Sequence, residues 1–312
     1  TQSCNSAGRC QANNRSGAMA CAPSGSGLPD QDKVCILNNQ GHCASDGFCE
    51  NGSFASVFTP APGVNIPVNG WNLINPANFF ATRDSFRQQV ISSAQLAKVA
   101  STAGAGSLGQ QAGGITLDPT KLSYAGQSLG GILGSLYSCV APEVRNSALN
   151  VPGGGLTNII LTSQHPGLMA LKNAFQAGLA AQGVPLNSPS YDTFLGIVQW
   201  IVDPADPLNA GPYLVKDTGL GNGLGNGGST RRGFIQWVLN DQVVPNPTTV
   251  DLIQSVLADP TATGVLVTPG ATPNFWAKQW VSTANHGFLL VGPDAAAAQA
   301  EIANFISGAA PF

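Results

Sequence analysis

The sequence predicts an α/β fold in which a mostly parallel sheet is covered by helices, and three observations support it. From about residue 120 onward, strand-like stretches alternate with stretches of helical periodicity. A G-x-S-x-G pattern lies between the first predicted strand of this region and the helix after it. Hydrophobic residues make up 43% of the 312 residues, which is enough apolar material for a sizeable core.

The charge composition argues against several classes of protein. Charged residues are only 9% of the chain, against roughly 25% in an ordinary soluble domain. The 16 acidic and 13 basic side chains give a formal net charge of −3 with no long run of either sign, so we expect no nucleic-acid partner. No apolar stretch approaches the ~18 residues of a membrane-spanning helix, so we expect no membrane span.

Six of the seven cysteines lie within the first 49 residues. None of them forms a C-x-x-C pair, and although His42 could contribute to a zinc site, the prediction is three disulfides. Disulfides indicate an oxidising compartment. The chain begins at Thr1, with neither an initiator methionine nor a signal-peptide pattern, so we expect a processed protein that is secreted or periplasmic. The six cysteines are Cys4, Cys10, Cys21, Cys35, Cys43 and Cys49.

The first 115 residues predict little regular structure apart from one helix. Residues 1–53 are rich in Cys, Gly, Asn and Ser and cannot build a core of their own, so a disulfide-stapled segment is expected. Residues 54–80 predict an extended connector, and residues 101–115 predict a loop. The helix is predicted at about 84–100, with Asp84 near its start. Its apolar stripe comprises Phe86, Val90, Ile91, Ala94 and Ala97.

From about residue 120 the predicted strands and helices alternate, which favours a parallel, covered sheet. A helix through Ile132 and Tyr137 follows the first strand, and a last helix follows Asp294, which we expect to cap it. Residues 218–229 are of low complexity. Four strands are predicted, at 121–125, 147–151, 234–239 and 265–267, and two further helices at 167–182 and 191–202.

The stretch Gly126-Gln127-Ser128-Leu129-Gly130-Gly131 predicts a nucleophile elbow, because it joins a predicted strand to a predicted helix. Such a turn presents the Ser128 hydroxyl above the sheet, at the positive end of the helix. We expect the neighbouring strand and helix to collide with any side chain at Gly126 or Gly130. The alternative interpretation is a glycine-rich helix start without chemistry.

A serine hydroxyl needs an adjacent base, and the sequence offers three histidines. His42 lies in the cysteine-rich segment and His165 in the region predicted to form a cap. His286 follows the last predicted strand, in the place where the order nucleophile, acid, histidine requires the base. His286 is therefore the candidate base.

The acid is expected after an intermediate strand, where a carboxylate can orient the imidazole. Asp241 follows the strand predicted at 234–239 and is the candidate. Its rivals Asp203 and Asp206 are flanked by prolines and are better explained by turn chemistry. Asp251 is expected to start a helix.

The stretch Leu122–Gly155, with its GQSLGG elbow and the later run from Leu149 to Gly155, resembles secreted bacterial lipases and esterases of the α/β-hydrolase superfamily. The runs at 72–76 and 83–88 resemble the same group, and the likeness covers about residues 72–312. The resemblance implies an α/β-hydrolase fold, with residues 54–312 as the catalytic domain and a helical cap at about 152–232.

The resemblance also implies roles for individual residues. Ser128 is the nucleophile, Asp241 the acid, His286 the base, and the Leu129 main-chain N–H one oxyanion donor. The implied reaction is ester hydrolysis through an acyl-enzyme, with no metal or organic cofactor. The substrate is a small-molecule or polymeric ester. An amidase with the same three residues is one alternative, and a non-catalytic binding protein on the same fold is another.

The family's sheet has more strands than the four predicted here, and a loop before the elbow supplies its second oxyanion donor. Without those strands, the elbow strand lies at an open edge of the sheet. We therefore expect an N-terminal fragment of the same precursor to carry the first strands and that donor. The alternative is a divergent fold in which residues 54–70 supply the missing strand and donor. Cys139, on the predicted elbow helix, is expected to be a buried free thiol, with a disulfide to that fragment as the alternative.

Overall fold

The computed structural model describes parts of the chain that are separated by gaps, and it describes the side chains of most residues in those parts. The predicted N-terminal disulfides and the low-complexity stretch at 218–229 lie outside the described residues. The described ranges are 2–4, 10–12, 73–74, 78–102, 107–111, 113–115, 117–118, 121–141, 143–215, 231–270 and 272–312.

The chain divides into two compact units. The first comprises Thr1–Ser85 with Asn173–Phe175, and the second comprises Phe86–Lys172 with Gln176–Phe312. In the first unit, strands β1 (Gln2–Cys4) and β2 (Cys10–Ala12) pair antiparallel. The second unit contains a five-stranded sheet and the residues from 120 onward that the sequence singles out.

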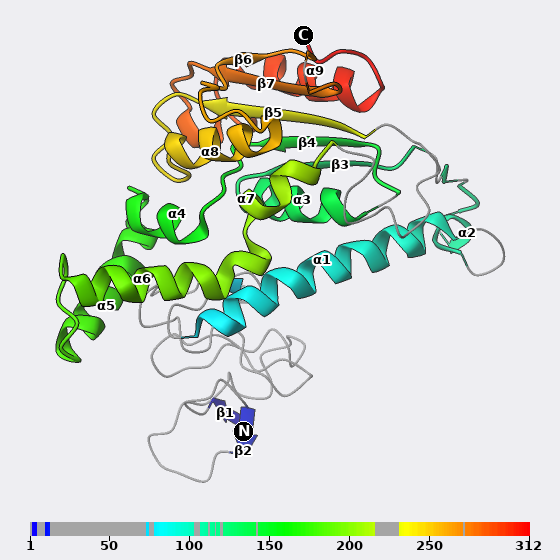
Figure 1. The fold of residues 1–312 in the computed structure, drawn as a ribbon. Helices are drawn as coiled ribbons and strands as arrows, with labels where there is room; N and C mark the ends of the chain where they lie inside the picture. The colour runs from blue at the N-terminus through cyan, green and yellow to red at the C-terminus, as the bar shows by residue number, and fades with distance from the viewer. Residues whose placement is uncertain are drawn as a thin grey trace. The chain divides into compact units, whose positions relative to one another are not determined.

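The sheet has the order β3-β4-β5-β7-β6 (Figure 1). Its first four strands are parallel, and β6 runs antiparallel to β7. The predicted class, a mostly parallel sheet with helices, is therefore confirmed. The strands are β3 (Ser123–Gln127), β4 (Asn146–Asn150), β5 (Arg232–Val238), β6 (Leu266–Val267) and β7 (Phe275–Trp280).

The prediction of four strands is wrong, because it omits β7. The sequence Phe-Trp-Ala-Lys-Gln-Trp places a lysine in the strand, which is unusual in a covered parallel strand. The structure accommodates Lys278 by pairing its ammonium with the Glu301 carboxylate and by placing it 4.3 Å from the centre of the Trp280 ring. The predicted ends of the other strands are within about two residues of those observed.

Helices cover both faces of the sheet (Figure 1). On one face, α3 and α8 pack on a core that includes Leu149, Ile235 and Phe275. On the other face, α9 packs on Ala148 and Phe234 through Phe305. The helices of the second unit include α3 (Leu129–Val140), α4 (Leu156–Thr162), α5 (Pro166–Ala181), α6 (Pro189–Val202), α7 (Pro207–Ala210), α8 (Asn246–Leu257) and α9 (Ala295–Ile306).

Helix α1 (Phe79–Ser101) begins about five residues earlier than predicted. Asn78 explains the difference, because its Oδ1 accepts a hydrogen bond from the Ala81 main-chain N–H at 3.0 Å and so caps the first turn. Asp84 lies inside the helix and pairs with the Arg83 guanidinium. Of the predicted apolar stripe, Phe86 and Ala97 are buried, whereas Ile91 is 61% exposed. Beyond it, the short helix α2 (Leu108–Gln111) interrupts the predicted loop.

Two further predictions about helix starts are corrected. Asp251 lies inside α8, which begins at Asn246 directly after Pro245. Helix α9 does begin after Asp294, but the Asp294 side chain makes no capping hydrogen bond.

In the described part of the chain, β3 pairs with β4 alone and is an edge strand, as predicted. In β3, Ala125 is exposed and the other residues are half-buried, whereas β4 and β5 are buried along almost their whole length. None of the helices in the described residues is both long and apolar enough to cross a bilayer.

Candidate functional site

Ser128 lies in a sharp turn between β3 and α3, with φ of 56° and ψ of −120°. Positive φ is rare for a residue with a side chain and marks a locally strained backbone. The turn is held by two main-chain hydrogen bonds, from the Ser128 N–H to the Asn150 carbonyl (2.9 Å) and from the Ile132 N–H to the Ser128 carbonyl (2.9 Å). The strand–turn–helix arrangement expected of an elbow is therefore present.

Glycine is required at some positions of this turn and not at others. A Cβ on Gly126 would lie 2.4 Å from the Gly130 carbonyl oxygen, so a side chain there is excluded, as predicted. At Gly130 the collision that we expected is wrong, because the nearest atom to a Cβ would be the Tyr124 hydroxyl oxygen at 3.9 Å. The tightest glycine of the helix is instead Gly134, where a Cβ would lie 2.1 Å from the Tyr124 ring.

The His286 imidazole joins Ser128 to Asp241. Its Nε2 lies 2.8 Å from the Ser128 Oγ, and its Nδ1 lies 2.7 Å and 2.9 Å from the two Asp241 carboxylate oxygens. A carboxylate can only accept, so it favours the tautomer with the proton on Nδ1, which leaves the Nε2 lone pair facing the serine hydroxyl. Along the chain, His286 is 158 residues from Ser128 and 45 residues from Asp241.

Asp241 is held by the turn that follows β5. Its Oδ1 accepts hydrogen bonds from the main-chain N–H groups of Val243 (2.8 Å) and Val244 (3.1 Å). The residue is only 6% exposed. The carboxylate is thus fixed in place by its own loop, and its Oδ2 is available to the imidazole.

His286 lies in a 3-10 turn, η8 (Asn285–Gly287), between β7 and α9. Asn285 before it has a φ of 49°, a conformation that asparagine tolerates better than most residues. The Gln127 side-chain amide donates to the His286 carbonyl at 3.1 Å. The sequence predicts no role for Gln127, and the one signal that it offers is the place of this residue directly before Ser128.

The residue predicted to be an oxyanion donor, Leu129, lies in the first turn of α3. Leu129 is the first residue of the helix, where main-chain N–H groups have no acceptor within the helix. Its N–H is adjacent to Ser128 in the chain and lies at the positive end of the helix dipole.

The rival candidates have other surroundings. His165 precedes α5, where its main-chain N–H bonds to the Ser163 Oγ at 3.2 Å, and His42 lies outside the described residues. Asp206 is completely buried, and its two oxygens accept from three main-chain N–H groups and one side-chain amide. Asp203 accepts from the same side chain, Gln199, at 2.8 Å. The turn chemistry predicted for Asp206 is confirmed by its bond to the Leu208 N–H at the start of α7.

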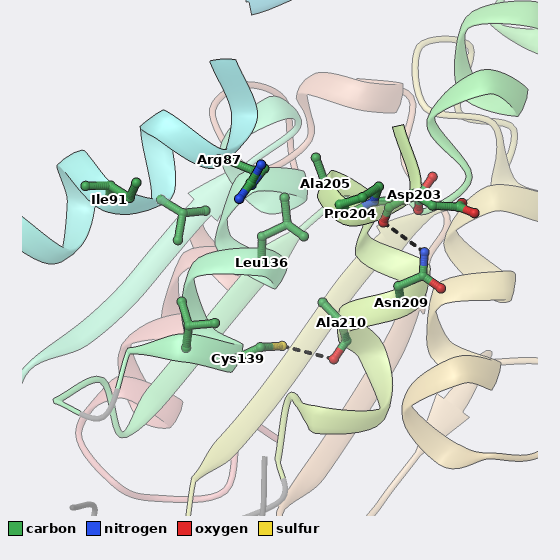
Figure 2. A pocket seen from close by; sticks show the side chains of 12 residues that line it. Arg87, Ile91, Leu136, Cys139, Asp203, Pro204, Ala205, Asn209 and Ala210 are labelled. Carbon is green, nitrogen blue, oxygen red and sulfur yellow. Dashed lines mark hydrogen bonds between the residues drawn. The ribbon is translucent and has the colours of Figure 1, made fainter. Parts of the chain in front are cut away.

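A cavity of about 420 Å³ lies between α1, α3 and the segment from Asp203 to Ala210 (Figure 2). Ser128, Asp241 and His286 are not among its lining residues. Cys139 forms part of its wall as a buried free thiol, as predicted, and its Sγ lies within hydrogen-bonding distance of the carbonyl oxygens of Ser135 (2.9 Å) and Ala210 (3.0 Å). Burial raises the pKa of this thiol to about 12, an effect that the charge of Arg231 partly offsets. This cavity is therefore separate from the Ser128 site.

Among the described residues, no group of three His, Cys, Asp or Glu side chains is arranged to hold a metal ion. The site that the described residues do assemble is a serine hydroxyl, an imidazole and a buried carboxylate in a hydrogen-bonded chain.

The chain matches no family model and no curated protein. Among solved structures it is similar to acetyl xylan esterase 1 from Thermoanaerobacterium sp. JW/SL YS485, at 16% identity and a TM-score of 0.39, over 71% of this chain and 53% of that one. It is also similar to the enol-lactonase from Burkholderia xenovorans LB400, at 12% identity and a TM-score of 0.28, over 62% of this chain and 68% of that one. The chain thus spans about half the length of the xylan esterase.

Proposed function

We propose that this protein is a serine hydrolase of carboxylic esters, built on an α/β-hydrolase fold and active outside the cytoplasm. The observation that carries the proposal is the Ser128 Oγ at 2.8 Å from the His286 Nε2, with the Nδ1 of the same ring bonded to the buried Asp241 carboxylate. A hydroxyl, a base and an orienting acid in this order are the parts that nucleophilic acyl transfer needs.

In the first half of the reaction, the Ser128 Oγ attacks the ester carbonyl carbon while its proton passes to the His286 Nε2. Asp241 stabilises the imidazolium that forms. The carbonyl oxygen becomes an oxyanion, which the Leu129 N–H stabilises. When the tetrahedral intermediate collapses, the bond to the alcohol oxygen breaks, and that oxygen takes the proton from the Nε2. The product is an acyl-serine.

In the second half, His286 takes a proton from a water molecule, whose oxygen attacks the acyl-serine carbonyl carbon. The bond between the acyl carbon and the Ser128 Oγ then breaks, and the imidazolium returns its proton to Oγ. The acid product leaves and the starting protonation state is restored. Our proposal places the second oxyanion donor in polypeptide outside the described residues.

The test is active-site labelling combined with hydrolysis of p-nitrophenyl esters. A fluorophosphonate probe is expected to label native protein at Ser128. Ser128→Ala is expected to lose both the label and about 10⁴-fold or more of the hydrolysis rate while remaining folded. Ser92→Ala, on the exposed face of α1, serves as the matched control and should keep both activities. Absence of labelling at Ser128 in folded native protein would instead favour a binding protein without catalytic activity.

A further inference from the structure

Gln127 links the elbow to the histidine loop. It is the last residue of β3, directly before Ser128, and its Nε2 donates to the His286 main-chain carbonyl at 3.1 Å. The two residues are 159 positions apart, so the bond joins two elements that the chain itself does not connect locally.

The turn that contains His286 makes no main-chain hydrogen bond to the His286 carbonyl. In that turn, the Phe288 N–H bonds to the Asn285 carbonyl (3.0 Å) and the Leu290 N–H bonds to the Gly287 carbonyl (2.8 Å). The carbonyl between them receives the Gln127 amide. Asn285, directly before His286, has a positive φ, which the backbone seldom adopts by its own preference. The direction of the backbone at His286 therefore depends also on contacts such as the Gln127 hydrogen bond.

Two connections hold the imidazole to the rest of the site in the free enzyme, one to Asp241 and one to Ser128. The second connection is lost in the acyl-enzyme, because the Ser128 Oγ is then esterified and has no proton to donate. The Gln127–His286 bond involves neither reacting atom and can persist through that state.

From this geometry we infer that Gln127 is a positioning residue that holds His286 in place relative to the elbow, above all during deacylation. The inference rests on the proposed function. It assigns Gln127 no contact with substrate, and its action passes entirely through the His286 main chain.

The test compares Gln127→Met, which keeps the length of the side chain without a donor, with the wild-type protein. Deacylation is expected to slow roughly tenfold, since small displacements of a reacting group have large rate effects. With slower deacylation, kcat and KM for a p-nitrophenyl ester fall together, kcat/KM changes less, and the burst of p-nitrophenol stays near one equivalent per folded enzyme. A role confined to stability would instead lower the burst per total protein and leave the single-turnover deacylation rate of the folded enzyme unchanged, and that result would overturn the inference.

Two further variants make the test specific. Gln127→Glu has nearly the same shape but presents no N–H donor at neutral pH, so it should also deacylate slowly; it answers the question if Gln127→Met does not fold. Gln299→Met is the matched control, because Gln299 also donates to a carbonyl downstream of the histidine, that of Leu289 at 2.8 Å, without reaching the elbow. Its deacylation rate should stay within about twofold of the wild type.

Failure of the inference and failure of the proposed function are distinguishable. Wild-type protein that neither hydrolyses esters nor reacts with the fluorophosphonate probe at Ser128 would refute the proposed function. An active wild-type enzyme whose deacylation rate is matched by both Gln127 variants would refute only the role of Gln127.

Discussion

Asp241 and Asp206 are both buried carboxylates beside turns, and they differ in how many further hydrogen bonds their oxygens can accept. Asp241 takes two main-chain N–H groups on Oδ1 and offers Oδ2 to an imidazole. Asp206 takes the N–H groups of Gly155 and Leu208 on Oδ1, and on Oδ2 the N–H of Leu156 and the side-chain amide of Gln199. The first carboxylate is fixed by its loop yet open to a partner. The second is fully occupied and joins the main chain at the start of α4, the main chain of α7 and a side chain of α6.

The comparison shows how two aspartates with similar burial can have separate roles. Burial alone does not distinguish an acid that orients a histidine from an acid that stabilises the fold. The number of donors already satisfied does distinguish them, because a carboxylate with about four acceptor positions can serve only a limited number of donors. Substitutions at the two sites should therefore affect different measurements.

The largest effect is expected for Asp241→Asn. The asparagine Oδ1 can keep both main-chain bonds, so the free energy of unfolding should change by less than about 1 kcal/mol. Its amide would face the Nδ1 of His286 and favour the tautomer whose Nε2 carries a proton, so kcat for ester hydrolysis should fall about 10⁴-fold. Steady-state kinetics and urea unfolding measure the two quantities. Normal activity would return Asp203 and Asp206 to consideration as the acid.

A smaller effect, on stability, is expected for Asp206→Asn. Replacing one oxygen by an amide leaves two buried donors without an acceptor, which should lower the free energy of unfolding by about 3 kcal/mol. The hydrolysis rate per folded molecule should change less than tenfold, because Asp206 does not contact His286. The neighbouring variant Asp203→Asn is the control, with an expected change below about 1 kcal/mol because Asp203 is only partly buried. A loss of kcat in Asp206→Asn without a loss of stability would break the distinction between the two aspartates.

The smallest effect concerns Cys139, a buried acid that faces carbonyl oxygens instead of N–H donors. Its pKa in the folded protein is raised to about 12 from an ordinary value near 9, so between these values the unfolded chain loses the proton first and stability falls as pH rises. The difference in unfolding free energy between wild type and Cys139→Ala should therefore shrink by about 1 kcal/mol from pH 8 to pH 10. Paired urea titrations at the two pH values measure it, and a difference that is independent of pH would contradict the assigned burial.

Much of the fold could be predicted from the sequence, because its signals are local. The elbow combines a glycine where a Cβ would collide, at Gly126, with a serine between a strand and a helix. Helix α3 and the parallel strands β4 and β5 follow from short apolar stretches separated by turn residues. Strand β7 was missed because Lys278 makes it look unlike a covered strand, and its partner Glu301 lies 23 residues away on α9.

From the sequence alone, Ser128 can be placed in the elbow, and the order of serine, acid and histidine along the chain can be predicted. The sequence favours Asp241 over its rivals Asp203 and Asp206, but the contact between Asp241 and the imidazole is seen only in the folded protein. This is because the number of hydrogen bonds that a carboxylate can still accept depends on donors far away in the chain. The amides that occupy Asp206 come from Gly155 and Leu156, about 50 residues earlier, whereas those on Asp241 come from the next turn and leave Oδ2 for a histidine 45 residues later.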